Sequence, residues 1–597
     1  MLSYLTVTEK LTILFTAPLP LAALALILTL LVIFPAAILV GKKLNQVYLS
    51  STGLLAFIPA FIISTAEFLL IDNFSYTVFG IGVSTFTGLG RIVHTLIFIA
   101  LLFFNLKKVK GLLQGDSLIA KYQTAFVYAV IVLLTISSAL LFSHQSSTDL
   151  RISESLGEVR QVNKSFNNVL IFSSDGIDAA HMSAYGYQRP TTPFIETLLD
   201  ESLVFENHFT NSAKTTGSVG SLLSGKLPTT TRVIFRPDIF TGIHMFQHLP
   251  GYLKQYGFHN GDVSIRHYVD AYDLNMREAF DYANGRNIED EGLPLPAFFK
   301  QKLTSTTSFL QEVNGRISGR LLHIFGITTM YNPFLAVTRL DRDKAHDTDR
   351  ERMDQLKQFI ATTDTPFFIN VHLMSTHGGM FPIEQPVFSR GREQEEDWDI
   401  DFYDDAILQY DGYTKEIVDF LKQQGLYDST LLILNSDHGF QWGIDRSLPL
   451  IMHYPGEEHR GRVKVNSQRL DIGPTILDYL GLPIPEWMEG QSLTQSTGKL
   501  MDPIYIANRM PSTRSHGWRV VENPEPPFYT LGSLHVILCN RIYNLDLQED
   551  VFSMGDIGDH SMPCEADQFP SAGDVHQDLL QHLEAAGYDV SGLQTPR

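Results

Sequence analysis

The chain has 597 residues, two cysteines and a formal net charge of −20, and its mean hydropathy is close to zero. This length excludes a single small domain. The neutral hydropathy of so acidic a chain comes from uneven distribution, because the residues before about 145 are very apolar and almost all the acid follows them. We expect no nucleic-acid partner.

Four apolar runs precede residue 145, and each is close to the roughly 20 residues that cross a bilayer as a helix. They lack a polar face, which disfavours a soluble bundle, and three of them follow the first, which disfavours a cleaved signal peptide. We therefore predict a transmembrane helical domain over residues 1–145. Its spans are Leu19–Val40, Leu54–Ile71, Phe86–Phe104 and Thr124–Phe142.

Basic residues set the expected orientation of these spans. They lie after the first span and between the third and fourth, at Lys42, Lys43, Lys107, Lys108, Lys110 and Lys121. By the positive-inside rule these loops are cytoplasmic. The large acidic part then lies outside, so we expect an integral bacterial inner-membrane protein with a periplasmic or extracellular domain.

Three ionisable residues, Glu67, Arg91 and His94, fall at membrane depth. Such groups are costly there unless paired. They are interpreted either as structural pairs or snorkelling side chains, or as a polar notch that admits a lipid headgroup.

The rest of the chain divides into a polar linker over 146–166 and an exported domain over 167–597, with a C-terminal subdomain from about residue 500. Short apolar runs at 167–176, 366–373 and 429–439 are typical of buried parallel strands. An amphipathic helix is predicted over 407–421, and its apolar face is formed by Ile407, Tyr410, Thr414, Ile417 and Leu421. Alternating strands and helices predict an α/β fold with a mainly parallel central sheet.

Acids and histidines follow the predicted strands, at Asp175, His377, Asp437 and His438. Ligands of open α/β sheets bind beyond the carboxyl ends of the strands. A single acid at a strand end is more often a turn or a helix cap. Together, the oxygen and nitrogen donors of Asp175, Asp437 and His438 predict a divalent metal site.

The stretch "NSAKTTGSVGSLLSGKLP" (Asn211–Pro228) is rich in hydroxyls and glycine. A helix is predicted to start at "SLLSG" (Ser221–Gly225), and its free amides together with Lys214 favour an anion. A threonine held against a metal becomes a usable nucleophile. The alternative is a Ser/Thr-rich surface loop.

From about Asn167 to Asp550 the chain resembles the sulfatase-like branch of the alkaline phosphatase superfamily. The resemblance lies in "NVLIFSSDGIDAAHMSAYGYQRPTTPFIETLLDESLVFENHFTNSA", "THGG", "LYDSTLLILNSDHG", "LPLIMHYPG", "DIGPTILDYLGLPIP" and "IYNLDLQED". It implies that Asp175, Thr215, Asp437 and His438 bind one divalent metal (Mn, Zn, Ca or Mg), with a second ion left open. Carried over in the same way, Thr215 rather than Thr216 attacks, and His377 binds the substrate or assists the leaving group.

The departures from the family pattern narrow the expected chemistry. Classical sulfatases carry a cysteine or serine followed by proline and arginine for conversion to formylglycine, whereas this chain has Thr215, Gly217 and Val219. The usual pair of acids at the first metal site is reduced to Ser174–Asp175. These features are similar to the membrane-bound phosphoglycerol and phosphoethanolamine transferases, whose threonine takes a headgroup from a phospholipid donor and passes it to a glycan or lipid acceptor. The alternatives are a sulfuric ester hydrolase and a non-catalytic lipid-binding regulator.

Some assignments depend on the tertiary structure. Lys214 and Arg446 are expected to bind the substrate, Arg446 because the loop after "SDHG" is shorter than in relatives. His453 is interpreted as either functional or structural, and His372 as a core residue. Cys539 and Cys564 either form a disulfide, as an oxidising compartment permits, or are free thiols.

Overall fold

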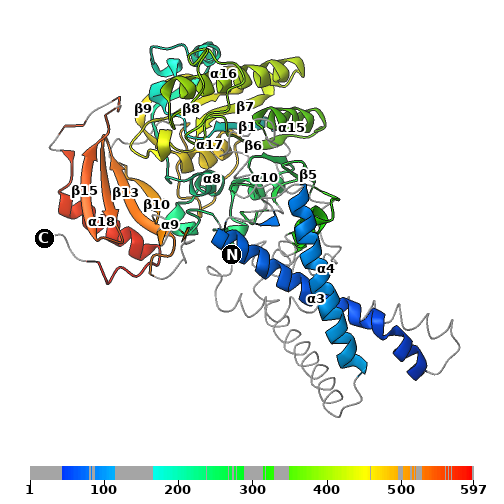
Figure 1. Cartoon of the computed structure of the whole chain (residues 1–597). Coiled ribbons are helices and arrows are strands. Elements are labelled where there is room, and N and C mark those ends of the chain that lie inside the picture. Colours follow the sequence, from blue (N-terminus) through cyan, green and yellow to red (C-terminus); the bar gives the residue numbers. More distant parts are fainter. Residues whose placement is uncertain are drawn as a thin grey trace.

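The computed structural model describes residues 44–114, 166–287, 314–328, 348–494 and 502–593, apart from short gaps inside these ranges. Figure 1 shows two long helices near the N-terminus, a large α/β domain and a smaller C-terminal sheet. The predicted spans at 19–40 and 124–142 and nearly all of the predicted linker lie outside the described residues.

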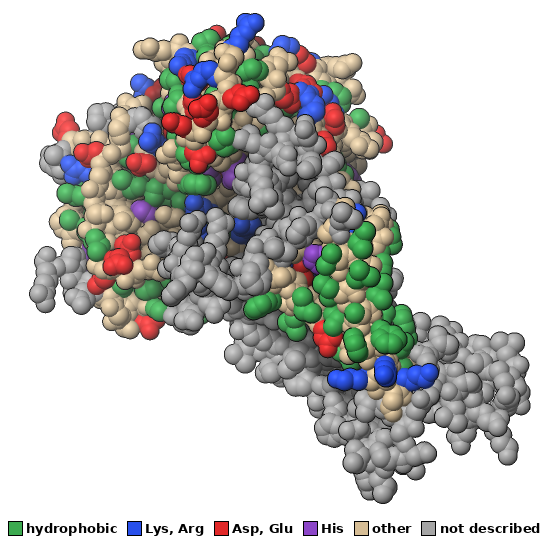
Figure 2. Space-filling model, viewed as in Figure 1, with side chains coloured by type: hydrophobic (Ala, Val, Ile, Leu, Met, Phe, Trp, Pro, Cys, Tyr) green, Lys and Arg blue, Asp and Glu red, His purple; other side chains and the backbone are tan. Residues whose placement is uncertain are grey.

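The N-terminal helices are α3 (Leu44–Phe79) and α4 (Leu89–Gln114), and they pack against each other. The second predicted span falls within α3, and the third falls within α4 from Leu89 onward. Among the described residues, one helical stretch, Gly90–Gly111, is long and apolar enough to cross a membrane, and only 6% of it is buried. Figure 2 shows its apolar side chains on the molecular surface, with basic side chains at the end far from the α/β domain. The predicted four-helix bundle therefore keeps one candidate span here and otherwise remains a prediction.

Two of the ionisable residues in these helices, Glu67 and His94, form hydrogen bonds inside the protein. Asn105 Nδ2 donates to Glu67 Oε2 at 2.7 Å, and His94 Nδ1 lies 2.9 Å from the Gly90 carbonyl oxygen. At Glu67 the geometry is that of a structural pair between two helices.

The large domain is built on a mixed sheet in the order β5-β4-β3-β6-β1-β7-β8-β2-β9. Its central strands β3, β6, β1 and β7 pair in parallel, while β8 runs antiparallel to both β7 and β2, so the prediction of a mainly parallel sheet is confirmed. The strands run over Asn168–Ser174 (β1), Leu203–Phe209 (β2), His259–Val263 (β3), Tyr282–Ala283 (β4), Arg286–Asn287 (β5), Phe367–Leu373 (β6), Thr430–Ser436 (β7), Leu448–His453 (β8) and Gly461–Gln468 (β9).

Helices cover both faces of this sheet (Figure 1). One face carries α8 (Thr215–Ser224), α10 (Leu249–Gln255) and α17 (Ile472–Tyr479), and the other carries α15 (Asp349–Ala361) and α16 (Ile400–Gln423). The predicted helix at 407–421 lies within α16, and its whole predicted apolar face is buried. Continuous apolar strands with helices on both sides are what a buried parallel sheet requires.

The C-terminal part forms a second, antiparallel sheet in the order β10-β13-β14-β15, packed against helix α18. Its elements are β10 (Ile504–Arg509), β13 (Leu531–Leu538), β14 (Arg541–Asp546), β15 (Val551–Asp556) and α18 (Ala572–Ala585), with a separate hairpin of β11 (Arg514–Ser515) and β12 (Trp518–Arg519). Cys539 and Cys564 form a disulfide beside this sheet, with their Cα atoms 6.2 Å apart.

Candidate active site

Two aspartates meet at the carboxyl edge of the main sheet because their strands are neighbours. Ser174 of β1 pairs with Ser436 of β7, so Asp175 and Asp437 each follow the last residue of a paired strand. The Gly176 amide donates to Asp437 Oδ1 at 3.0 Å, which fixes one carboxylate against the turn that carries the other. Both aspartates are buried.

Thr215 faces these carboxylates and Thr216 does not. The Thr215 hydroxyl donates to Asp175 Oδ2 at 3.1 Å and lies 3.4 Å from His438 Nε2. The Thr216 hydroxyl points away and donates to the Tyr268 carbonyl at 3.1 Å. Of the two adjacent threonines, only Thr215 therefore lies within reach of the acid and imidazole groups.

The helix that carries Thr215 starts earlier than predicted. We expected a start at Ser221, but α8 begins at Thr215 itself and ends at Ser224, where Gly225 takes a φ of 64°. Gly217 allows this early start, because a Cβ there would lie 2.4 Å from Ser212 Oγ. The alternative of a surface loop is wrong, since every residue of α8 is buried.

Hydroxyl side chains of the same stretch fasten it to the end of β7. Both Thr210 and Ser218 donate to the carbonyl oxygen of Asp437, at 2.7 and 2.6 Å. The loop before Thr215 is also bonded to the C-terminal sheet, because the amide of Ala507 in β10 donates to Asn211 O at 2.9 Å and that of Ala213 donates to Ala507 O at 3.1 Å. Elements far apart in the chain thus hold Thr215 in place.

Four side chains form a compact set of metal donors. Single ligand atoms of Asp175, His372 and Asp437 lie within 4.8 Å of one another, and His438 Nε2 lies 3.3 Å from Asp437 Oδ2 and 3.6 Å from Asp175 Oδ1. Asp437 Oδ2 is buried and accepts no hydrogen bond from the described residues. Carboxylate and imidazole donors around an oxygen with unused lone pairs fit a divalent cation.

His372 is buried, as its interpretation as a core residue requires, and its side chain also belongs to this set. Its Nε2 lies 3.4 Å from Asp175 Oδ2. It pairs with Ser173 in the parallel register of β6 and β1, one residue before that pair of strands ends. Its position near the end of a predicted strand was the available signal, because it places His372 at the same sheet edge as Asp175.

Ser174 stands where the family pattern has the second acid of the first metal site, and its side chain has a different role. Ser174 is buried, and its hydroxyl hydrogen-bonds with Thr376 Oγ1 at 2.8 Å. Ser174 therefore links β1 to the turn after β6 and does not extend the donor set.

The electrostatic environment keeps the carboxylate of Asp175 charged. Burial alone would raise the pKa of the Asp175 carboxyl, but the imidazoles of His377, His438 and His372 outweigh burial and hold this pKa well below its usual range. Behind Asp437, the guanidinium of Arg469 is fully buried and donates to Asn435 Oδ1 at 2.5 Å. Burial lowers the pKa of Arg469 to about 10, so it remains a cation at neutral pH.

His377 follows β6 in a turn that is anchored from another helix. Its Nδ1 is buried without a hydrogen-bond partner among the described residues. Burial lowers the pKa of its imidazole, and the charge of Asp175 opposes this shift. The turn is held by Asp349, the first residue of α15, whose carboxylate accepts from the amides of Met374 (2.8 Å) and Ser375 (2.6 Å).

Replacing Asp349 by alanine is expected to lower the free energy of unfolding by about 3 kcal/mol, because buried amides and the guanidinium of Arg352, 2.8 Å from Asp349, lose their charged partner. Asp354 lies exposed on the same helix. Its alanine variant is expected to stay within about 0.5 kcal/mol of the parent protein. Thermal or denaturant unfolding of the two purified variants measures the difference, and equal stabilities would contradict the anchoring role.

The two basic residues predicted to bind the substrate, Lys214 and Arg446, contact different partners. Lys214 Nζ lies 4.1 Å from the centroid of the Trp442 ring. Burial, together with the charge of Arg509, lowers the pKa of Lys214 to about 8. Arg446 Nη1 lies 3.6 Å from Asp178 Oδ2, with its side chain half exposed. Lys214 is thus next to Thr215 in the chain. Arg446 instead pairs with Asp178, which follows Asp175 by three positions.

The model of the family described as Sulfatase matches residues 167–482, which is more than half of the chain. This match contains Asp175, Thr215, His377, Asp437 and His438. The chain belongs to the Sulfatase family. This membership agrees with the predicted resemblance to the sulfatase-like branch.

The sulfatase-family chain is similar to several known proteins at low identity. An arylsulfatase of Hemicentrotus pulcherrimus is 22% identical over 364 residues, or 53% of this chain and 59% of that protein. Iduronate 2-sulfatase of Homo sapiens is 22% identical over 514 residues, or 73% of this chain and 85% of that protein. The solved phosphonate monoester hydrolase of Agrobacterium radiobacter has a TM-score of 0.46 and 18% identity, covering 70% of this chain and 95% of that one. The chain spans 20% to 59% of the length of the first curated relatives it matches.

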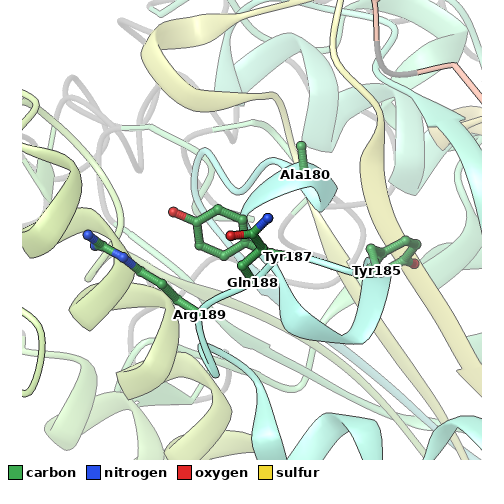
Figure 3. A pocket seen from close by; sticks show the side chains of 6 residues that line it. Ala180, Tyr185, Tyr187, Gln188 and Arg189 are labelled. Carbon is green, nitrogen blue, oxygen red and sulfur yellow. The ribbon is translucent and has the colours of Figure 1, made fainter.

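A separate hollow of about 380 Å³ lies in the loop after β1 of this sulfatase-family domain, lined by residues 180 and 185–189 (Figure 3). Tyr187 and Arg189 point toward α16 there, where the Tyr187 hydroxyl donates to Asp404 at 3.0 Å and Arg189 binds Asp401 and Asp404. Because Asp401 and Asp404 already pair with Arg189, we interpret this hollow as a structural feature of the surface.

His453 is structural by its surroundings. It is the last residue of β8, and its ring stacks on Tyr427 with centroids 4.6 Å apart.

Proposed function

We propose that this sulfatase-family enzyme is a metal-dependent, membrane-anchored transferase or hydrolase of a phospholipid headgroup, of the phosphoglycerol or phosphoethanolamine transferase type. The observation that carries the proposal is the threonine hydroxyl of Thr215, directed at Asp175 and His438 from the first turn of a buried helix. The free amides of that turn favour an anionic ester.

The residue type at position 215 separates this proposal from sulfate-ester chemistry. Formylglycine is made from cysteine or serine, and the chain's two cysteines pair with each other far from position 215 in the sequence. A threonine hydroxyl can instead attack the phosphorus of a phosphodiester, so that a phosphothreonine forms as the alcohol leaves. Sulfate-ester hydrolysis stays the second candidate, because curated relatives include arylsulfatases.

In the proposed reaction Asp175, Asp437 and His438 would hold a divalent ion, and His372 would add a further donor. Such an ion would supply a lower pKa for a neighbouring hydroxyl and charge neutralisation at a phosphoryl oxygen. Thr215 Oγ1 forms a bond to phosphorus as the bond from phosphorus to the diacylglycerol oxygen breaks. The hydroxyl proton of Thr215 passes to the leaving oxygen, assisted by His377, and Lys214 supplies a cation beside the phosphoryl group. An acceptor glycan or lipid, or water, then takes the headgroup from Thr215.

The N-terminal helices support a membrane location. The basic residues Lys107, Lys108 and Lys110 are exposed near the C-terminal end of α4. Figures 1 and 2 show that this end points away from the α/β domain. This is the arrangement expected if the domain lies outside an inner membrane and the lysines lie in the cytoplasm.

Mass spectrometry of the full chain incubated with phosphatidylglycerol or phosphatidylethanolamine vesicles tests the proposal. We expect a phosphoglycerol or phosphoethanolamine adduct on the peptide Lys214–Lys226, and the mass of the adduct identifies the donor. An adduct on another peptide would contradict the mechanism. Turnover of a sulfate ester without turnover of any phosphodiester would favour the second candidate instead.

A further inference from the structure

The segment Asn314–Thr328 departs from the α/β domain and packs against the N-terminal helices. Its residue Ile324 joins a buried apolar cluster with Phe68 of α3 and Phe98 of α4. The Thr95 hydroxyl donates to the Ile324 carbonyl at 2.7 Å, and the rings of Phe98 and Phe325 meet edge to face at 6.0 Å. The segment therefore lies beside the first turns of α4.

An ion pair fixes the position of this segment. Arg320 Nε lies 2.6 Å from Asp72 Oδ2, and Asp72 is only 4% exposed. The other oxygen of Asp72 accepts from the Val83 amide at 2.7 Å. One buried carboxylate thus joins α3, the connection to α4 and the 314–328 segment, which sets the height of the segment along the helices.

Near the Arg320–Asp72 ion pair, the segment exposes large apolar side chains on the protein surface. Phe325 is 48% exposed and Ile327 is 69% exposed. On the adjoining helix α4, Val93 and Leu96 are 57% and 61% exposed. The apolar surface therefore continues from the candidate span onto the segment.

The depth of the contact is set by helix geometry. A helix over Gly90–Gly111, 22 residues long, spans about 33 Å at 1.5 Å per residue, close to the hydrocarbon thickness of a bilayer. Thr95 and Phe98 lie about 8 to 12 Å from its outer end by the same rise. The lysines mark the opposite end, so the side that carries the segment is the outer one.

We propose that Asn314–Thr328 is an interfacial element whose exposed apolar side chains, led by Phe325 and Ile327, lie in the outer leaflet among phospholipid headgroups and upper acyl chains. It holds the catalytic domain against the lipid surface from which the donor is taken. This inference rests on the proposed function for the membrane location and the lipid donor.

Contact between the segment and lipid can be tested by fluorescence quenching, which does not depend on enzymatic activity. Because the chain's two cysteines pair with each other, Ile327→Cys is labelled selectively with an environment-sensitive fluorophore in the full chain, which is then reconstituted in phosphatidylcholine vesicles. We expect strong quenching by phosphatidylcholine that carries a doxyl spin label in the upper acyl chain. The matched control is Val387→Cys, which is 54% exposed and whose backbone amide donates to Asp405 of α16. Helix α16 lies on the side of the α/β domain away from α3 and α4 (Figure 1). Equal quenching at the two positions would overturn the proposal.

A second experiment separates lipid docking from chemistry. We expect Ile327→Glu to lower turnover of vesicle phosphatidylglycerol or phosphatidylethanolamine roughly tenfold, because a carboxylate is disfavoured in the interface. Its turnover of a water-soluble nitrophenyl phosphodiester and the activities of Val387→Glu should stay at the parental level. An equal loss on both substrates would overturn the docking role. If the parent protein turns over neither ester, the proposed function fails, while the quenching result still decides where the segment lies.

Discussion

Replacing Thr215 by alanine is expected to lower turnover of the phosphodiester by about 10⁴-fold or more, the size of loss found when a catalytic nucleophile is removed. The hydroxyl of Thr215 is the one that reaches Asp175 and His438. Without it no covalent intermediate forms, so the headgroup adduct should disappear from the peptide that contains residue 215. Steady-state kinetics and mass spectrometry of the variant measure both effects.

The adjacent threonine provides the matched control. Thr216→Ala removes a hydroxyl of the same type from the same helix turn, but this hydroxyl donates to a backbone carbonyl away from the aspartates. We expect activity within about tenfold of the parent, since a neutral hydrogen bond contributes about 1 kcal/mol. Loss at Thr216 with activity retained at Thr215 would show that the assigned nucleophile is one position off.

The second large effect is expected from Asp437→Asn. The substitution preserves shape but removes a charge from an oxygen that is buried and accepts no hydrogen bond from the described residues. Metal content measured on purified protein should fall from about one ion per chain to near zero, and turnover by roughly 10³-fold or more, because a metal ion contributes several kcal/mol to such reactions. Unfolding temperature should also lose its response to chelator, since a ligand that binds only the folded state stabilises it.

Asp445→Asn is the control for that experiment, because Asp445 is exposed and belongs to the loop that follows the site. It should retain both metal and activity. Full metal content in Asp437→Asn would instead place the ion elsewhere, and the proposed role of the Thr215 hydroxyl would then lose its basis.

Much of the sheet and three of the four donors, Asp175, Asp437 and His438, follow from sequence pattern alone. The strands at 168–174, 367–373 and 430–436 are continuous apolar runs, which are typical of buried parallel strands. Since parallel strands end at one edge, Asp175 and Asp437 were expected to meet there. The sequence of a single strand does not specify its register with its neighbour. The pairing of His372 with Ser173, which brings His372 close to Asp175, was therefore not predicted.

Other features depend on contacts between distant segments. Asp349 anchors the turn before His377 across the boundary between a helix and a strand end, and Arg469 lies behind Asp437 from a later loop. Neither residue carries a local signal. The start of α8 was misplaced because "TTGSVG" has low helix propensity, and here hydrogen bonds to the end of β7 override propensity.

The hydrogen bonds between Ala507 and the strand-like loop at Asn211–Ala213 also bear on how the enzyme can be divided. A protein cut after residue 494 would keep every proposed catalytic side chain but would leave two backbone groups beside the nucleophile without their partners. The C-terminal sheet thus supports the loop that leads to Thr215. We therefore expect the smallest active unit to extend past residue 482, where the family match ends.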